Sequence, residues 1–406
     1  MNKIIQLAWR NIWRNKRRTI ITSASIFFGV VFSTFMTSMQ EGSYSQMITT
    51  IVNSYSGHIQ IFKNGYYEDK VVNNSLEYSP QLQSAIRNIK HIRTITPRLE
   101  SYALASSMDL TKGVMVIGIK PEPENQITGL SKKIIKGKYL SDHDSGILLG
   151  SSLARYMKLG INDTLVLLSQ GYHGTSAAGR YIVKGIIRQP SPELDRGVVY
   201  MDFNECQEFL SAPGRATSVV AITEKNEDVS RVKSSLTATL GPGFDIKDWK
   251  ELNRILLTQI ESDRASGMII KGVLYLIVAF GIFGTIMMMT MERRKEFGVL
   301  VAVGMQKIRL GYMLLTESVL IGLSGSISGI LASLPLTWYF LYHPIWFTGQ
   351  TAESFLQMGF EPVMSFSVAP QVFIRQALTI MSFSFLIGLY PLFTVKRMKV
   401  NKALRG

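Results

Sequence analysis

Four long, mostly apolar stretches of the 406-residue sequence contain no Asp, Glu, Lys or Arg, and this feature limits the fold more than any other. They cover residues 19–40, 272–291, 318–342 and 376–395. A helix crosses a hydrocarbon core about 30 Å thick with about 20 residues, so each stretch is long enough to span a bilayer. We therefore predict a membrane protein with four transmembrane α-helices.

The charged residues indicate how these helices are oriented. The chain carries 44 Lys and Arg against 29 Asp and Glu, a formal net charge of +15. Residues 1–19, 292–309 and 396–406 hold +6, +3 and +5 of this charge, whereas residues 343–371 contain no Lys or Arg. Short basic segments stay in the cytoplasm. Both termini are therefore predicted to be cytoplasmic, and the excess of base reflects topology and not a nucleic-acid partner.

The spans and the charges together predict nine segments, of which the largest lies outside the cytoplasm between the first two transmembrane helices. The segments are a cytoplasmic amphipathic N-terminal helix (1–18), the first transmembrane helix (19–40), an extracytoplasmic domain (41–267), the second transmembrane helix (268–291), a cytoplasmic link (292–311), the third transmembrane helix (312–342), a short extracytoplasmic loop (343–371), the fourth transmembrane helix (372–395) and a cytoplasmic tail (396–406).

The large extracytoplasmic segment is predicted to be an α+β domain. Short β-branched runs predict strands at 58–62, 114–119, 146–149, 164–169, 181–187, 198–201 and 218–222. Helical periodicity predicts helices at 81–89, 151–157, 203–209 and 229–240. Apolar spacing at 249–260 and after Gln40 predicts helical stalks that lengthen the first two transmembrane helices. The single cysteine, Cys206, cannot form an internal disulfide and is interpreted as a small buried side chain.

Motifs of catalysis are absent from the sequence. It contains no G-x-x-x-x-G-K-[ST] phosphate loop, no H-E-x-x-H or C-x-x-C metal motif and no G-x-S-x-G nucleophile elbow. We therefore predict no catalytic residue, no metal site and no enzyme activity in this chain. A membrane-anchored enzyme or receptor would need a site in the extracytoplasmic segment, and the residues indicate none.

Small residues recur on the first and third transmembrane helices. They let helices approach closely in a bilayer, where apolar side chains gain little by leaving lipid. We predict close helix packing at these positions: Ser25, Gly29, Ser33, Gly322, Gly325 and Gly329.

The cytoplasmic link begins with charged residues, 292–296, and continues with an apolar face that includes Phe297 and Leu300. This pattern predicts a short amphipathic helix at the membrane surface. Such a helix is either a docking element for a soluble partner or a plain interfacial anchor. The physical pattern alone favours the anchor.

Several motifs together resemble the FtsX-like/MacB-like permeases of ATP-binding-cassette transporters. Within the membrane part they are residues 292–298 (ERRKEFG), 301–304 (VAVG), 317–318 (ES) and the N-terminal 8–19 (AWRNIWRNKRRT). Outside it, residues 57–60 (GHIQ), 117–121 (IGIKP), 136–140 (KGKYL) and 147–150 (ILLG) are similar to the lipoprotein-releasing permeases in particular. The resemblance covers nearly the whole chain and implies a MacB-like core in the periplasmic domain.

The resemblance implies a mechanism and the residues that serve it. The permease binds a cytoplasmic ATPase subunit through a coupling helix between the second and third transmembrane helices, and ATP-driven motion then moves the periplasmic domain. Carried over to this sequence, the coupling residues are Glu292, Arg294, Glu296, Phe297, Gly298 and Gly304.

The resemblance also implies partners and a location. They are a separate ATPase subunit that uses ATP and Mg²⁺, a second permease subunit in a homo- or heterodimer, a lipid or lipoprotein substrate, and a periplasmic carrier as a further candidate; this chain itself binds no cofactor. The expected function is extraction of a substrate from the outer leaflet of the bacterial inner membrane, with lipoprotein release favoured. The alternatives are a MacB-like efflux permease and an FtsX-type signalling protein that regulates cell-wall enzymes.

Overall fold

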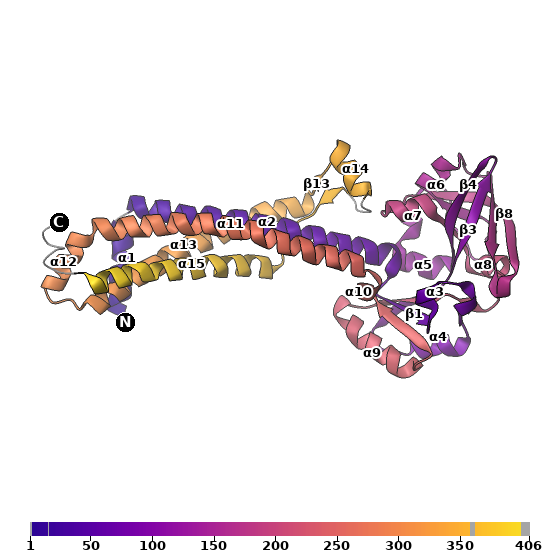
Figure 1. Cartoon of the computed structure of the whole chain (residues 1–406), viewed down its shortest axis with the longest axis horizontal. Helices are drawn as coiled ribbons and strands as arrows, with labels where there is room; N and C mark the ends of the chain where they lie inside the picture. The colour runs from indigo at the N-terminus through magenta and orange to yellow at the C-terminus, as the bar shows by residue number, and fades with distance from the viewer. Residues whose placement is uncertain (1, 15, 358–361, 399–406) are drawn as a thin grey trace. The chain divides into compact units, whose positions relative to one another are not determined.

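A computed structural model describes residues 2–14, 16–357 and 362–398 (Figure 1). The chain divides into two compact units. We call them the helical unit, which comprises Met1–Ser45, Gln259–Trp346 and Val363–Gly406, and the α+β unit, which comprises Gln46–Thr258 and Phe347–Pro362. Of the predicted tail at 396–406, residues 399–406 lie outside the described residues.

The prediction of four membrane-spanning helices is confirmed in the part of the chain that the structure describes. The helices are α2 (Lys16–Ile51), α11 (Arg254–Glu292), α13 (Lys307–Tyr342) and α15 (Pro370–Arg397), and each contains one of the uncharged stretches. A π-helix, η1 (Val52–Ser56), directly follows α2. The apolar pattern after Gln40 is therefore helical, as expected.

Shorter elements complete the helical unit and its connections. The N-terminal helix α1 spans Asn2–Arg14 and is shorter than the predicted 1–18, because α2 begins at Lys16. It buries Ala8 and Ile12 and leaves Trp9 and Trp13 more than half exposed. The predicted loop after α13 contains β13 (Ile345–Trp346), which pairs with β14 (Val363–Met364), and α14 (Gly349–Gln357).

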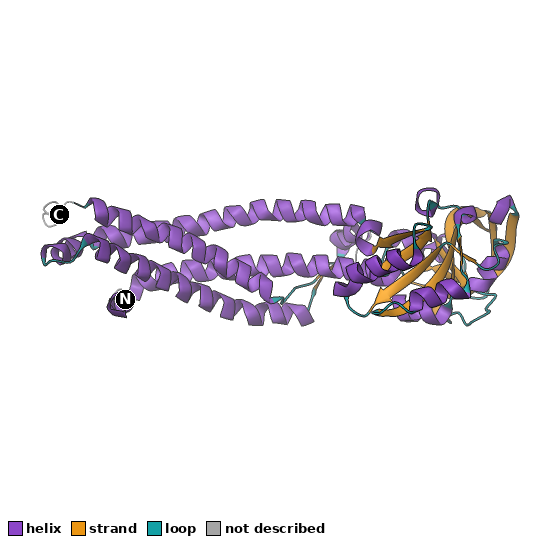
Figure 2. Cartoon of the chain, turned by 90° about the horizontal axis from the view of Figure 1, so that it is seen from below, coloured by secondary structure: helices purple, strands orange, loops and turns teal. Residues whose placement is uncertain are grey.

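The α+β unit is built on a ten-stranded mixed sheet (Figure 2). The strand order is β12-β1-β11-β3-β4-β9-β6-β8-β5, and β7 pairs with β3 and β8. The strands are β1 (Ile59–Lys63), β3 (Ile92–Ser107), β4 (Leu110–Ile119), β5 (Ile134–Gly137), β6 (Ile147–Gly150), β7 (Thr164–Gln170), β8 (Ser176–Ile187), β9 (Val198–Asp202), β11 (Ser218–Thr223) and β12 (Phe244–Asp248). A separate pair joins β2 (Leu76–Glu77) to β10 (Arg215–Ala216).

Eight helices accompany this sheet among the described residues. They are α3 (Tyr66–Asp69), α4 (Pro80–Arg87), α5 (Pro121–Thr128), α6 (Ser151–Tyr156), α7 (Pro192–Gly197), α8 (Phe203–Phe209), α9 (Val229–Leu240) and α10 (Trp249–Leu252). All seven predicted strands and all four predicted helices are present, so the α+β prediction is confirmed. The predicted helix at 249–260 is interrupted at Asn253, after an Asp248–Glu251 capping box starts α10.

The longest strand, β3, was not predicted. It contains Pro97, which usually marks an edge strand or a strand end, and its later inward positions carry small or polar side chains such as Ser101 and Ala103. Its sixteen residues pair with β4, β7 and β11, so partners in the sheet stabilise a segment with a weak local pattern. Cys206 is fully buried, as expected, and this burial raises the pKa of its thiol.

Candidate functional site

A nine-residue helix, α12 (Arg294–Ala302), separates α11 from α13. The predicted link 292–311 is thus divided: α11 ends at Glu292, and α13 already begins at Lys307. Gly304 follows α12 with a φ of +106°, a backbone conformation that favours glycine over residues with a Cβ atom. This glycine therefore ends α12 and allows the chain to turn into α13.

The predicted coupling residues have different surroundings. Arg294, Glu296 and Gly304 are exposed, and Gly298 is buried. Glu292 is paired with Arg18 at the start of α2. Arg294 therefore presents an exposed charge at the start of α12, and the coupling role of these residues stays a prediction.

Phe297 is buried within the helical unit. Its side chain is 1% exposed and packs in a cluster with Ala8 of α1, Leu310 and Leu314 of α13, and Val395 of α15. In this arrangement it has no surface to offer to a pocket on a partner. The amphipathic pattern reports an apolar side correctly, but it does not distinguish a partner's surface from the protein's own helices.

A buried charged residue that the sequence analysis did not single out is Arg293, which immediately precedes α12. Its Nη1 donates to both carboxylate oxygens of Glu317 on α13, at 3.0 Å each, and its Nε donates to Glu296 at 3.3 Å. The Arg293 and Glu317 side chains are only 7% and 6% exposed. The available signal was Glu317 itself, because an acid beside an uncharged span needs a partner nearby.

Further ion pairs extend from this buried pair to the surface. Glu296 also accepts a hydrogen bond from Nη2 of Arg14 at 2.7 Å, and both side chains are more than half exposed. Exposed pairs of this kind contribute about 0–1 kcal/mol, so they add little stability. Together the pairs connect the end of α1, the start of α12 and the first half of α13.

The four glycines predicted to pack closely lie at contacts within the helical unit. A Cβ atom added to Gly325 would lie 2.7 Å from Cβ of Ile26, and one added to Gly329 would lie 2.7 Å from Cβ of Val30. The corresponding contacts of Gly29 and Gly322 are with Val278 at 2.8 Å and Ser384 at 2.9 Å. Ser33 is buried, whereas Ser25 is half-buried, and each donates to a carbonyl of its own helix.

The described residues contain no group of three or more His, Cys, Asp or Glu side chains that could hold a metal ion. The two buried charged side chains described above, Arg293 and Glu317, form an ion pair with each other. In this region α12 packs against α1, α13 and α15, and charged side chains lie at its surface.

Comparisons with known proteins match both units. The model of the MacB-like periplasmic core domain matches residues 19–239, and the model of the FtsX-like permease C-terminal region matches residues 268–400. The first match includes most of α2 and most of the α+β unit. The second includes α12, α13 and Glu317.

Individual relatives resemble the chain over long stretches. It is 24% identical to the lipoprotein-releasing system transmembrane protein LolC of Xylella fastidiosa strain Temecula1, over 76% of each chain. It is 20% identical to the macrolide export ATP-binding/permease protein MacB of Agrobacterium fabrum, over 83% of this chain and 53% of that protein. The solved periplasmic region of MacB from Actinobacillus actinomycetemcomitans is 13% identical, covers 52% of this chain and 98% of that one, and gives a TM-score of 0.37.

Proposed function

Because the chain belongs to the MacB-like and FtsX-like family of ABC transporter permeases, a family of multi-pass inner-membrane proteins, we propose that it couples ATP hydrolysis in a separate cytoplasmic subunit to release of a lipoprotein from the outer leaflet. The permease chain itself performs no bond chemistry in this scheme. ATP and Mg²⁺ belong to the ATPase subunit. A second permease subunit completes the membrane part, and a periplasmic carrier is a candidate acceptor of the substrate.

The extent of the similarities supports lipoprotein release over drug efflux. The match to LolC extends over about three quarters of both chains, whereas the match to MacB covers about half of that longer protein. Efflux of the MacB type is the second candidate, because the match to MacB covers 83% of this chain. Release of a lipoprotein by purified components distinguishes the two.

The observation that carries the mechanism is the buried contact between Arg293 and Glu317. With this pair and the Phe297 side chain in place, α12 cannot shift without moving the cytoplasmic end of α13. An ATPase subunit that binds the exposed charged side chains of α12 would therefore also displace the membrane helix α13. Arg293 is a positioning residue in this scheme, and Arg294 and Lys295 are the docking residues.

Charge reversal on α12 tests the docking step. The double variant Arg294→Glu, Lys295→Glu changes two exposed side chains, so membrane insertion is expected to be normal. Co-purification of the ATPase subunit is expected to fall at least tenfold, since charge-assisted contacts are lost and replaced by repulsion. The matched control, Arg155→Glu with Lys136→Glu, reverses two exposed charges of the α+β unit and should retain the ATPase. Undiminished co-purification with reversed charges on α12 would contradict the proposal.

A second variant separates docking from transmission. Arg293→Met combined with Glu317→Met removes both buried charges together and keeps similar side-chain volumes, a change that is often tolerated. The ATPase subunit should still co-purify, because α12 keeps its exposed charges. Stimulation of ATP hydrolysis by substrate should be lost. If stimulation survives, the buried pair does not transmit motion.

The proposed orientation places both termini in the cytoplasm. Asn226 and Lys295 are exposed positions in the α+β unit and on α12, and the native Cys206 is too buried to react. In intact spheroplasts, a membrane-impermeant thiol reagent should label Asn226→Cys directly and Lys295→Cys only after permeabilisation. Labelling of Lys295→Cys in intact spheroplasts would contradict the proposed orientation and indicate the opposite one.

A further inference from the structure

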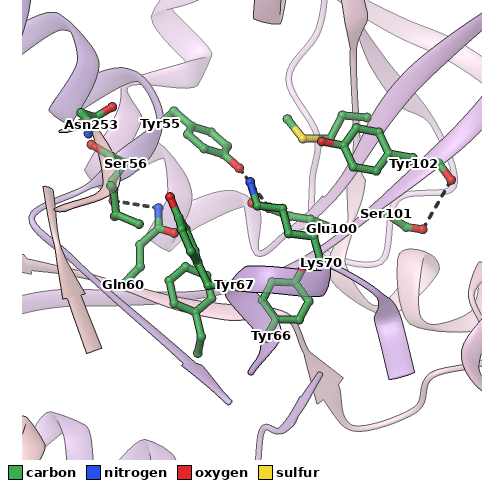
Figure 3. Close-up of a pocket in the computed structure, with 13 residues that line it drawn as sticks. Tyr55, Ser56, Gln60, Tyr66, Tyr67, Lys70, Glu100, Ser101, Tyr102 and Asn253 are labelled. Carbon is green, nitrogen blue, oxygen red and sulfur yellow. Dashed lines mark hydrogen bonds between the residues drawn. The ribbon is translucent and has the colours of Figure 1, made fainter. Parts of the chain in front are cut away.

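The α+β unit contains a pocket of about 150 Å³ that none of the predicted functions uses (Figure 3). Its volume corresponds to about five water molecules, so it can accept a small organic group. Five aromatic rings, the carboxylate of Glu100, the ammonium group of Lys70 and several neutral side chains line it. The aromatic residues are Tyr55, Phe62, Tyr66, Tyr67 and Tyr102.

The carboxylate in the wall is Glu100 of β3. Its Oε2 accepts a hydrogen bond from the Tyr55 hydroxyl at 2.9 Å, and its backbone N–H donates to Thr217 Oγ1 at 2.9 Å. A carboxylate has about four acceptor positions, so this environment leaves capacity for a ligand that donates. Burial raises the pKa of Glu100, and the charges of Arg98 and Lys70 and the hydrogen bond from Tyr55 only partly offset this rise.

The nearest arginine is held by other acceptors. Arg98 donates to Glu124 through Nε at 3.1 Å and Nη2 at 2.7 Å, and its Nη1 donates to the backbone oxygen of Tyr55 at 2.6 Å. Arg98 thus fixes the position of η1, from which Tyr55 enters the pocket. Its attraction for Glu100 lowers the carboxyl pKa without outweighing burial.

The aromatic rings favour positive charge. The rings of Phe62 and Tyr66 are stacked with their centroids 5.7 Å apart. The Nζ atoms of Lys70 and Lys247 lie 5.1 and 4.8 Å from the centroid of the Tyr67 ring, so that ring already attracts two ammonium groups. Aromatic faces with a nearby carboxylate are the arrangement by which proteins recognise organic cations.

We propose that this pocket binds a small organic ammonium ion, with the ammonium group between Glu100 and the tyrosine rings. The site is composed of segments that lead to two membrane helices. Tyr55 and Ser56 belong to η1, which directly follows α2, and Asn253 joins α10 to α11. A π-helix such as η1 often marks a functional site. A bound ligand would touch both of these connections.

Calorimetric titration of the full-length detergent-purified chain with choline tests the proposal. Choline should bind with one-to-one stoichiometry, and its uncharged carbon isostere, 3,3-dimethylbutan-1-ol, should bind at least tenfold more weakly. Equal affinity for the two compounds, or no saturable binding of choline up to about 10 mM, would overturn the ammonium site. The titration needs no ATPase subunit, so its outcome is independent of the proposed transport function.

Matched variants locate the site. Glu100→Gln retains an acceptor for the Tyr55 hydroxyl and should weaken choline binding at least tenfold. Tyr67→Leu removes a ring face and should weaken binding severalfold without changing the charge. Glu205→Gln removes a partly exposed carboxylate on α8 and should leave the affinity unchanged. Choline affinity that Glu100→Gln does not alter would place the ligand elsewhere and overturn the assignment.

The affinity should also depend on pH. The titratable and charged groups around Glu100 are Tyr55, Tyr66, Tyr67, Lys70, Arg98, Tyr102, Glu124, Tyr200 and Cys206. Protonation of Glu100 removes its negative charge, so choline binding should weaken as the pH falls through the raised pKa of Glu100. The Glu100→Gln variant should lose this dependence. An unchanged pH profile in that variant would show that Glu100 is not the recognising group.

Discussion

Both units of this protein bury an arginine against a glutamate, and the two pairs differ in the further hydrogen bonds that each arginine makes. In the α+β unit, Arg98 and Glu124 are each 1% exposed and meet through two parallel hydrogen bonds. In the helical unit, a single nitrogen of Arg293 reaches both oxygens of Glu317, and its Nε turns to the exposed Glu296.

Among the described residues, the Arg98–Glu124 pair hydrogen-bonds to no further charged side chain, whereas the Arg293–Glu317 pair continues to a third charged residue, Glu296. Buried ion pairs contribute less stability than their geometry suggests, because desolvation opposes the attraction. The closed pair of Arg98 and Glu124 therefore mainly determines where η1 lies on the sheet. The pair of Arg293 and Glu317 continues through Glu296 to Arg14 at the surface, so hydrogen bonds link an exposed arginine to a residue of α13.

Breaking the closed pair should have the largest effect on stability. Arg98→Met leaves Glu124 buried without a partner and should lower the free energy of unfolding by about 3–5 kcal/mol. Adding Glu124→Leu removes the unpaired charge and should restore much of this loss. Thermal unfolding of the full-length chain, together with limited proteolysis of the α+β unit, measures both steps. A double variant as unstable as Arg98→Met alone would show that packing, and not the unpaired charge, sets the cost.

The stability of the helical unit should depend more on the volume of side chains at its helix contacts than on their charge. Gly325→Leu places atoms where the first added carbon already lies 2.7 Å from Ile26 Cβ and 2.8 Å from the Ser23 carbonyl oxygen. The expected cost is about 1–3 kcal/mol, seen as a lower yield of folded protein in detergent. Gly284→Leu on α11, where no atom lies within 4 Å of the added carbon, is the control and should fold normally. Similar behaviour of the two variants would argue against close packing of α13 on α2.

A buried carboxylate without an arginine sharpens the comparison. Burial alone would raise the pKa of Asp195, but hydrogen bonds from Gln189, Ser152 and Ser151 outweigh it and lower the pKa below 3.8. The folded state therefore binds a proton less readily than the unfolded state, so this stabilisation is present above pH 3.8 and is lost as the pH falls through the lowered pKa. Asp195→Asn should cost about 1–2 kcal/mol near neutral pH and reduce the loss of stability in acid. Urea unfolding between neutral and acidic pH provides the measurement, and an Asp195→Asn variant with an unchanged acid profile would contradict this account.

The smallest effect is expected at the exposed end of the hydrogen bonds that continue from the Arg293–Glu317 pair. Arg14→Gln removes a contact between side chains that are 57% and 52% exposed, so stability should change by about 0.5 kcal/mol or less. The same variant should weaken substrate-stimulated ATP hydrolysis if Arg14 takes part in transmission. A large loss of stability, measured by thermal unfolding, would show that this contact is structural like the Arg98 pair.

Local patterns in the sequence were sufficient for much of the fold. The four uncharged stretches identified the membrane helices because a long apolar helix is recognisable from composition alone. Strands such as β9 and β11 were predicted because their β-branched runs are short and bounded by turn residues. Helices α8 and α9 were predicted at the residues where they occur. These features depend on neighbours in the sequence, which a single sequence reports directly.

Other features were decided only when distant segments met. The sequence showed that Phe297 lies on an apolar face, but only packing against α1, α13 and α15 showed what covers it. Arg293 and Glu317 are 24 residues apart, and β3 gains its strand conformation from partners far along the chain. The Glu100 pocket likewise combines η1, α3 and β3. Periodicity shows which side of an element is apolar or charged, whereas the identity of its neighbour is determined by the tertiary contacts that compensate burial.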